Sequence, residues 1–188
     1  MSEAVSALDG RSFDGIARVE EAGLRGMIAI RGDLSSAELR KAATDISGTE
    51  FPGPREVKSA GGKAICWMAP DEVLLLCAYE EAPAAAATVG TALAGTHALV
   101  ANVSDARAVF RVSGPAAREA VAKLTPADLS PGAFGPGEFR RTRLAQVAGA
   151  LWMPEEDVIE VLCFRSVAVY VFDILRAAAL PGGEVGYF

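Results

Sequence analysis

The sequence predicts an α+β protein built from two similar halves, each with the element order β-α-β-β-α and a mostly antiparallel sheet. Two observations carry this prediction. The first is an internal repeat: residues 66–77 read CWMAPDEVLLLC, and residues 151–163 read LWMPEEDVIEVLC. The second is that both halves alternate short runs of strand periodicity with runs of helical periodicity.

The two copies of the repeat keep a nearly constant separation. Trp67 and Trp152 lie 85 residues apart, and the cysteines that end the two apolar runs lie 86 residues apart. Such a small difference is what a change in loop length produces. We therefore expect a first half at residues 1–98, with an N-terminal extension, and a second half at residues 99–188, with a C-terminal tail. Both halves together are expected to form one compact unit.

The first half opens with a strand and a helix. Ile28 and Ile30 alternate with their neighbours, which is strand periodicity. Ser35 and Glu38 have the spacing of a capping box, in which each residue satisfies a free backbone N–H of the other. A helix should therefore begin just after Ser35 and end before Gly48.

A hairpin and a second helix complete the first half. Residues 64–68 and 73–79 are apolar runs on either side of a short polar turn, so both are expected to be strands. Pro83 suits the first turn of the next helix because its missing N–H has no partner there, and Gly95 suits the end of that helix.

The second half repeats this order. Ala108, Phe110 and Val112 share one face of an expected strand. Pro115 then favours the start of a helix, and Pro126 limits that helix to residues up to Thr125.

The rest of the second half contains a loop, a hairpin and a last helix. Residues 127–139 are rich in Pro and Gly and indicate an ordered loop. Residues 147–153 and 158–164 are expected to be the two strands of the hairpin. Ser166 could cap a final helix, although the run 167–172 also fits a strand.

Composition excludes several kinds of partner. The chain has 188 residues, of which 51% are hydrophobic, so it can bury a core, and its net charge is −6. This acidic balance argues against binding to nucleic acid or to an anionic membrane surface. The sequence has no basic and apolar leader and no run of about 20 apolar residues. We therefore expect a cytoplasmic protein whose three cysteines are core thiols.

Residues that could carry chemistry are sparse. His97 is the only histidine, and no motif supplies it with a nucleophile or a carboxylate partner. The sequence has no phosphate-binding G-x-x-x-x-G-K-[ST] loop and no dinucleotide-binding glycine motif after a strand. The acids at the two hairpin turns are explained by turn formation and hydration. We predict no catalytic, cofactor-binding or metal-binding residue in this chain.

Two groups of residues are candidates for contact with a partner. Arginine suits interfaces because it binds carboxylates through two parallel hydrogen bonds, and terminal aromatic residues can anchor a partner surface. A solvated basic face remains the alternative explanation for the arginines. The candidate interface residues are Arg140, Arg141, Arg143, Arg165, Tyr187 and Phe188.

One long stretch resembles a known fold. Residues 101–131 read ANVSDARAVFRVSGPAAREAVAKLTPADLSP. This resembles the start of the folate-binding aminomethyltransferase, or glycine-cleavage T-protein, family. That family shows a D-V-S strand, a strand ending in V-x-G, a helix and an L-T-x-N-D-[LV]-S loop. Residues 102–104, 112–114, 124–125 and 128–130 stand at the corresponding places.

Taken as a whole, the chain more specifically resembles the gamma subunits of heterotetrameric sarcosine oxidases. The stretches that carry this resemblance lie mostly within residues 17–175 and read GLRGMIAIRGDLSS, CWMAPDEVLLLC, VSDARAVFRVSGPAAREAVAKLTPADLSP, F-x-P-G-E-F-R-R-T-R-L-A-Q-V and CFRSVAVYVFDIL. As a set these stretches are specific, whereas any one alone is weak.

The resemblance implies a role in a larger enzyme. The chain would be a non-catalytic subunit supporting assembly of a cytoplasmic complex. That complex oxidatively demethylates sarcosine to glycine, with formation of hydrogen peroxide and 5,10-methylenetetrahydrofolate. Its partners would be the alpha, beta and delta subunits. FAD, FMN, NAD and tetrahydrofolate would be held by the partner subunits, and none by this chain.

An alternative is a stand-alone folate-binding protein or aminomethyltransferase-like enzyme, and it rests on the likeness to the T-protein fold alone. One departure from that family's pattern counts against it. The T-protein pattern places an acid soon after its paired glycines, whereas Gly149 here is followed by Ala150, Leu151 and Trp152. No folate ligand or proton shuttle can be carried over to this place.

Overall fold

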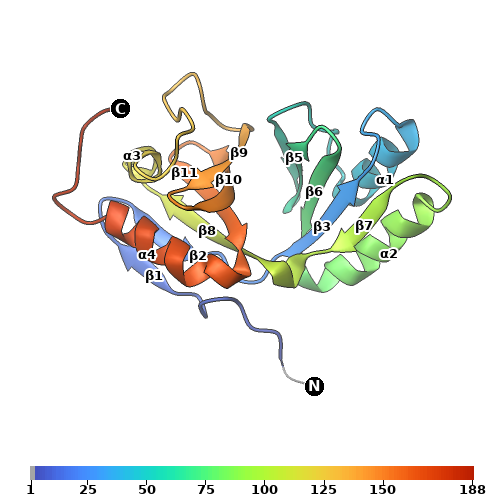
Figure 1. The fold of residues 1–188 in the computed structure, drawn as a ribbon, viewed down its shortest axis with the longest axis horizontal. Helices are drawn as coiled ribbons and strands as arrows, with labels where there is room; N and C mark the ends of the chain where they lie inside the picture. The colour runs from blue at the N-terminus through green and yellow to red at the C-terminus, as the bar shows by residue number, and fades with distance from the viewer. Residues whose placement is uncertain (1–2) are drawn as a thin grey trace. The chain divides into compact units, whose positions relative to one another are not determined.

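The computed structural model describes residues 3–188 and contains two compact units (Figure 1). One unit is Leu24–Ser104, with a five-stranded sheet. The other consists of the chain up to Gly23 together with Asp105–Phe188, with a six-stranded sheet. We refer to them as the five-stranded unit and the six-stranded unit. Neighbouring strands pair antiparallel in both sheets, which confirms the predicted α+β class.

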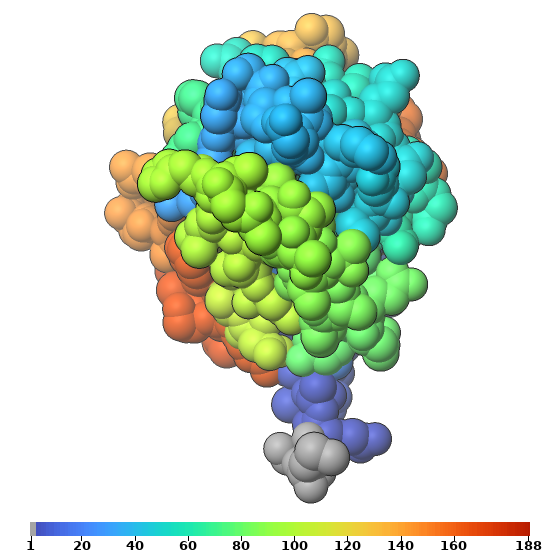
Figure 2. Space-filling view, turned by 90° about the vertical axis from the view of Figure 1, so that its right-hand side faces the viewer, coloured from blue at the N-terminus to red at the C-terminus, as the bar shows by residue number. Residues whose placement is uncertain are grey.

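The five-stranded sheet has two helices packed on one face. Alternate residues of the strands form the core with apolar residues of both helices, because successive side chains of a strand point to opposite faces. Figure 2 looks onto these helices, α1 in blue and α2 in green. The strand order is β4 (Val57–Ala60), β5 (Lys63–Ala69), β6 (Glu72–Cys77), β3 (Gly26–Arg31) and β7 (Leu99–Asn102). The helices are α1 (Ala37–Ser47), η1 (Tyr79–Glu81, one 3-10 turn) and α2 (Ala82–Ala92).

The six-stranded sheet is built in the same way. Phe110 and Val161 of the sheet pack with Phe172 and Leu175 of its last helix in one core. No helix among residues 3–188 is long and apolar enough to cross a membrane. The strand order is β1 (Ser12–Asp14), β2 (Arg18–Glu21), β8 (Arg107–Ser113), β11 (Val158–Phe164), β10 (Val147–Glu155) and β9 (Phe139–Leu144). The helices are η2 (Ser104–Ala106), α3 (Ala117–Ala122), η3 (Arg165–Val167) and α4 (Ala168–Ala178).

The internal repeat extends to matching hydrogen bonds. The N–H of Gly32 donates to the carbonyl oxygen of Asp71 at 2.9 Å, and the N–H of Gly114 donates to that of Asp157, also at 2.9 Å. In each unit the hairpin register shifts just after the repeated tryptophan. A single 3-10 turn then leads into the second helix of each unit. The repeat predicted from sequence is therefore a repeat of structure.

The N-terminal segment does not extend the first half. Strand β2 pairs with β8 in the six-stranded sheet, just as β7 pairs with β3 in the five-stranded sheet. The place that β7 fills after α2 is thus filled in the other unit by a strand from the start of the chain. The expected division at residues 98 and 99 differs from the structure for this reason, and residues 99–102 belong to the five-stranded unit as β7.

Several helix ends differ from the predictions. Helix α2 ends at Ala92, before the expected Gly95, and α3 begins two residues after Pro115 and ends at Ala122. Helix α1 ends at Gly48, whose φ of 68° is the left-handed conformation that glycine adopts readily. Its N-cap is Ser36, whose Oγ accepts the N–H of Leu39, whereas Ser35 bonds to Asp33, so the predicted Ser35 cap is wrong. The predicted last helix is confirmed as α4, but its N-cap is Val167 and no side chain caps it.

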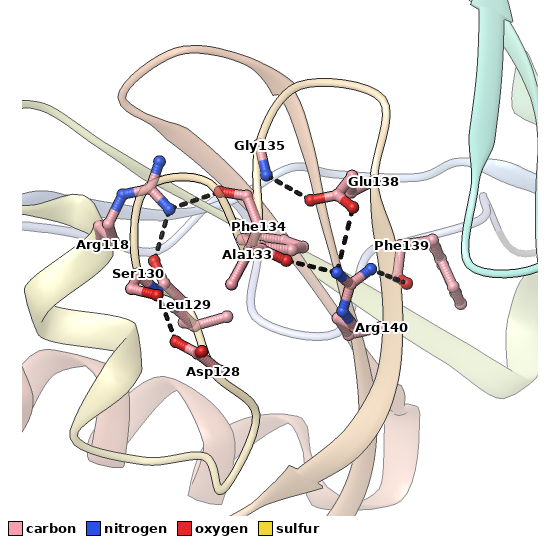
Figure 3. Close-up of polar contacts among 10 residues, drawn as sticks. All are labelled: Arg118, Asp128, Leu129, Ser130, Ala133, Phe134, Gly135, Glu138, Phe139 and Arg140. Carbon is pink, nitrogen blue, oxygen red and sulfur yellow. Dashed lines mark hydrogen bonds and ion pairs between the residues drawn. The ribbon is translucent and has the colours of Figure 1, made fainter.

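Arg118 holds the ordered loop between α3 and β9 (Figure 3). Its side chain is buried, and its Nη1 donates to the carbonyl oxygens of Leu129 at 2.5 Å and Phe134 at 2.7 Å. Its Nη2 forms an ion pair with Glu156 at 3.1 Å. Two loop carbonyls that would otherwise lack a partner are satisfied from within the fold, which explains the ordered loop predicted at residues 127–139.

All three cysteines are buried, as the sequence predicted for core thiols. Burial raises the pKa of Cys77, and it raises the pKa of Cys163 to about 12. The reactive form of cysteine is the thiolate, so both groups are protected from modification in the folded chain.

We predict that Arg118→Met lowers the free energy of unfolding by about 2–4 kcal/mol, because two loop carbonyls lose their donor while the aliphatic stem is kept. The measurement is urea denaturation followed by tryptophan fluorescence. Arg176→Met is the matched control, since Arg176 is exposed on α4, and it should stay within about 0.5 kcal/mol of the parent. Equal losses in the two variants would contradict the role given to Arg118.

We predict that Cys163 resists alkylation in the folded protein at pH 8. With a pKa of about 12, only about one Cys163 in ten thousand is a thiolate at that pH. Iodoacetamide treatment followed by peptide mass spectrometry measures this, and denaturation in urea should restore labelling. Rapid labelling of Cys163 without unfolding would show that the thiol is accessible.

Candidate functional site

Strand β9 separates the three neighbouring arginines onto two faces of the sheet. Side chains alternate along a strand, so Arg141 and Arg143 share one face and Arg140 lies on the other. The burial pattern agrees, because Arg141 and Arg143 are exposed and Arg140 is half-buried. The cluster seen in the sequence is therefore two different sites in space.

Arg140 is committed to the loop that precedes its strand (Figure 3). It donates to the carbonyl oxygens of Ala133 at 2.5 Å and Phe139 at 3.0 Å, and it pairs with Glu138 at 3.1 Å. Its guanidinium carbon lies 5.5 Å from the centre of the Phe134 ring. Arg140 and Arg118 thus hold the same loop through different carbonyls.

Of the three arginines of β9, Arg141 and Arg143 remain exposed. Arg143 donates to the carbonyl oxygen of Ala145 at 3.1 Å. Within residues 3–188, neither arginine forms an ion pair. Exposed guanidinium groups without an acidic partner are available to bind a carboxylate from another molecule.

Arg165 binds the N-terminal segment of the chain. It stands in η3 and donates to the carbonyl oxygens of Val5 at 2.8 Å and Ser6 at 3.1 Å. These hydrogen bonds go to backbone groups, so the structure does not join Arg165 to the arginines of β9 in one charged site.

The C-terminal segment is held against α3 by its backbone. The carboxylate of Glu119 accepts the N–H groups of Val185 at 2.5 Å and Gly186 at 3.1 Å. Lys123, which pairs with Glu119 at 3.5 Å, donates to the carbonyl oxygen of Gly183 at 2.6 Å. These backbone N–H bonds, that to Val185 above all, lower the pKa of Glu119.

A pocket of about 290 Å³ lies between this segment, α3 and the following loop. Tyr187 and Phe188 form part of its wall, with their ring centres 5.1 Å apart and their planes nearly perpendicular. Both rings are partly open to solvent, Tyr187 at 78% and Phe188 at 44%. The remaining lining residues are Glu119, Ala122, Lys123, Ala127, Asp128, Leu129 and Val185.

His97 lines a second pocket, of about 440 Å³, in the five-stranded unit. Arg31, Asp33 and Asp71 also line it, and Arg31 is paired with Asp71 and with the neighbouring Glu72. The residues that line this pocket include no serine, threonine or cysteine, and no group of three metal-binding side chains is found within the described residues. The pocket therefore offers no base and nucleophile pair.

Sequence reasoning missed Glu119, Lys123 and Arg118. The spacing of Glu119 and Lys123 indicates an ordinary pair on one helix face, and nothing local shows that the C-terminal segment lies over it. Nothing in the local sequence marks Arg118 either, because its partners lie 11 or more residues away.

The likeness to solved structures covers most of the chain. One similar structure is a chain of the heterotetrameric sarcosine oxidase from Corynebacterium sp. U-96, solved in complex with pyrrole 2-carboxylate. The TM-score is 0.79 at 28% identity, over 89% of this chain and 87% of that chain. Aminomethyltransferase T of the glycine cleavage system from Bartonella henselae shares the fold, with a TM-score of 0.57 at 16% identity over 80% of this chain and 43% of that chain.

Comparison of sequences leads to the same relatives. The chain is 35% identical over 137 residues to sarcosine oxidase subunit gamma of Corynebacterium sp. (strain U-96), and 36% identical over 134 residues to that of an Arthrobacter species. These matches cover 73% and 70% of this chain, which spans 65% and 63% of the length of the two relatives. The family model described as sarcosine oxidase, gamma subunit family matches residues 31–180. The chain therefore belongs to the sarcosine oxidase gamma subunit family.

Proposed function

We propose that the chain is a non-catalytic gamma subunit that assembles with the alpha, beta and delta subunits of a cytoplasmic heterotetrameric sarcosine oxidase. The observation that carries this proposal is the match over 87% of a chain from such a heterotetramer. The complex would convert sarcosine, tetrahydrofolate and dioxygen to glycine, 5,10-methylenetetrahydrofolate and hydrogen peroxide. FAD, FMN, NAD and tetrahydrofolate would be bound by the partner subunits.

A folate site in this chain fits its residues poorly. The place at which the T-protein pattern has an acid is occupied by Ala150, Leu151 and Trp152, and all three are buried residues of β10. Buried apolar side chains offer neither a carboxylate for a folate ring nor a group that moves a proton. We therefore assign the one-carbon chemistry to the partner subunits and not to this fold.

The partner surface that we propose combines charge with aromatic anchors. Arg141 and Arg143 supply exposed guanidinium groups, and Tyr187 and Phe188 supply rings beside an apolar pocket. Arginine and tyrosine are among the residues that contribute most to binding energy at protein interfaces. Arg140 and Arg165 are not assigned to this surface, because Arg140 is bound to the loop before β9 and Arg165 to the N-terminal segment.

We predict that the tagged chain, purified from its own cells, co-purifies with three further subunits as a yellow complex that oxidises sarcosine. The isolated chain should show no flavin absorbance, no sarcosine oxidation and no binding of tetrahydrofolate at micromolar concentration. Absorbance at 450 nm, peroxide formation and a folate titration are the three measurements. Flavin absorbance together with sarcosine oxidation by the isolated chain would overturn the proposal, and tight folate binding would favour a stand-alone folate protein.

We predict that Glu119→Ala releases the C-terminal segment that presents the two aromatic rings. Amide hydrogen exchange at Val185 and Gly186 should accelerate at least tenfold in this variant, because their acceptor is lost. Glu184→Ala is the control, since it removes an exposed acid of the same segment that accepts neither N–H group. Unchanged exchange in Glu119→Ala would show that the carboxylate does not hold the segment.

The same contact should depend on pH in a definite direction. The pKa of Glu119 is lowered in the folded chain, so its contribution is complete above the ordinary glutamate pKa of about 4.3. It is lost as the pH falls through the lowered value, when the carboxyl group takes up a proton. Protection of Val185 and Gly186, corrected for intrinsic exchange, should therefore be constant from pH 7 to pH 5 and fall only below the ordinary value.

A further inference from the structure

Strand β9 forms one edge of the six-stranded sheet. Its only neighbour among the described strands is β10, and the sheet ends there. It has six residues, whereas β1, β4 and β7, which end the sheets elsewhere, have three or four. An open strand edge presents unpaired backbone N–H and C=O groups, and a long one can accept another strand.

The hairpin geometry shows which backbone groups lie on this open edge. Leu144 and Val147 face each other across a two-residue turn, which makes them a hydrogen-bonded pair. Bonded and non-bonded pairs alternate along an antiparallel ladder, so Thr142 also bonds to β10. The N–H and C=O groups of Arg141 and Arg143 therefore point outward, and no hydrogen bond from the other described residues reaches them.

The side chains of the same two residues give this edge a charge. Arg141 and Arg143 are exposed on one face of the sheet, and the residues opposite them on β10 are Ala150 and Ala148. No acid on the neighbouring strand neutralises them. A second copy of β9 placed against this edge would bring arginine opposite arginine, which is unfavourable. The edge thus disfavours self-association and favours an acidic strand.

We propose that an extended segment of a partner subunit adds to β9 as a seventh strand, with acidic side chains at alternate positions opposite Arg141 and Arg143. This inference rests on the proposed function as a subunit of a larger complex. Backbone hydrogen bonds to the outward groups of the two arginines give the affinity, and the two ion pairs fix the register of the added strand. The face that carries Arg140 and Thr142 is already occupied by the loop before β9, so the charged face selects the partner.

The test uses the complex that co-purifies with the tagged chain. Amide hydrogen exchange, resolved to single residues by fragmentation, is compared between the free chain and the complex. Strand addition predicts that the amides of Arg141 and Arg143 become at least tenfold slower in exchange. In parallel, the double variant Arg141→Glu with Arg143→Glu should capture at least tenfold less of the partner subunits. The control Arg176→Glu changes an equally exposed arginine on α4 and should capture them normally.

The outcomes separate this inference from the proposed function. If the complex forms but both amides exchange as fast as in the free chain, strand addition is wrong. If the double variant captures the partners normally, the β9 edge is not part of the interface, while the role as a subunit stands. If the parent chain captures no partner, both the inference and the proposed function fall. Circular dichroism of the double variant should match the parent, which shows that a loss of capture is not a loss of fold.

Discussion

The fold of each unit depends on one backbone hydrogen bond, which joins the end of a central strand to the turn of the neighbouring hairpin just before a helix begins. In the five-stranded unit the N–H of Gly32 donates to the carbonyl oxygen of Asp71, and in the six-stranded unit the N–H of Gly114 donates to that of Asp157. The pairing of β3 with β6, and of β8 with β11, therefore extends to the hairpin turn before the chain enters the helix. A side chain at Gly32 would approach Leu39 of the next helix to 3.0 Å, and Gly114 has a φ of 110°. Both positions therefore favour glycine, for two different reasons.

Features set by local periodicity could be predicted from the sequence, whereas features set by chain topology could not. The hairpins and helices follow from apolar patterns and from Pro and Gly at element ends, and the structure has them close to the expected residues. Strand β2 could not be predicted from the sequence, because four residues show little periodicity and its partner strand β8 lies about 90 residues away. The N-cap of α1 is Ser36 and not the predicted Ser35, because the N–H and hydroxyl of Ser35 donate to the carboxylate of Asp33.

The positions of the candidate site's side chains also could not be predicted from the sequence. Arginines next to each other in a sequence look like one patch, but a strand sends neighbours to opposite faces, so Arg140 orders a loop while Arg141 and Arg143 remain exposed. The contact between Glu119 and Val185 joins residues 66 positions apart and uses a backbone donor. Nothing in the sequence marks a backbone donor, because every residue except proline has one.

The two units also differ at the edges of their sheets. The cores repeat the same strands, hairpin and second helix, and the outer strands also correspond, β7 with β2 and β4 with β9. The corresponding edges differ: β4 has four residues, and β9 has six with two exposed arginines. A duplicated core constrains every buried position through packing, whereas an edge strand constrains only half of its backbone groups. An edge strand can therefore change more freely than the core, and in this chain the longer and more charged of the two corresponding edges is β9.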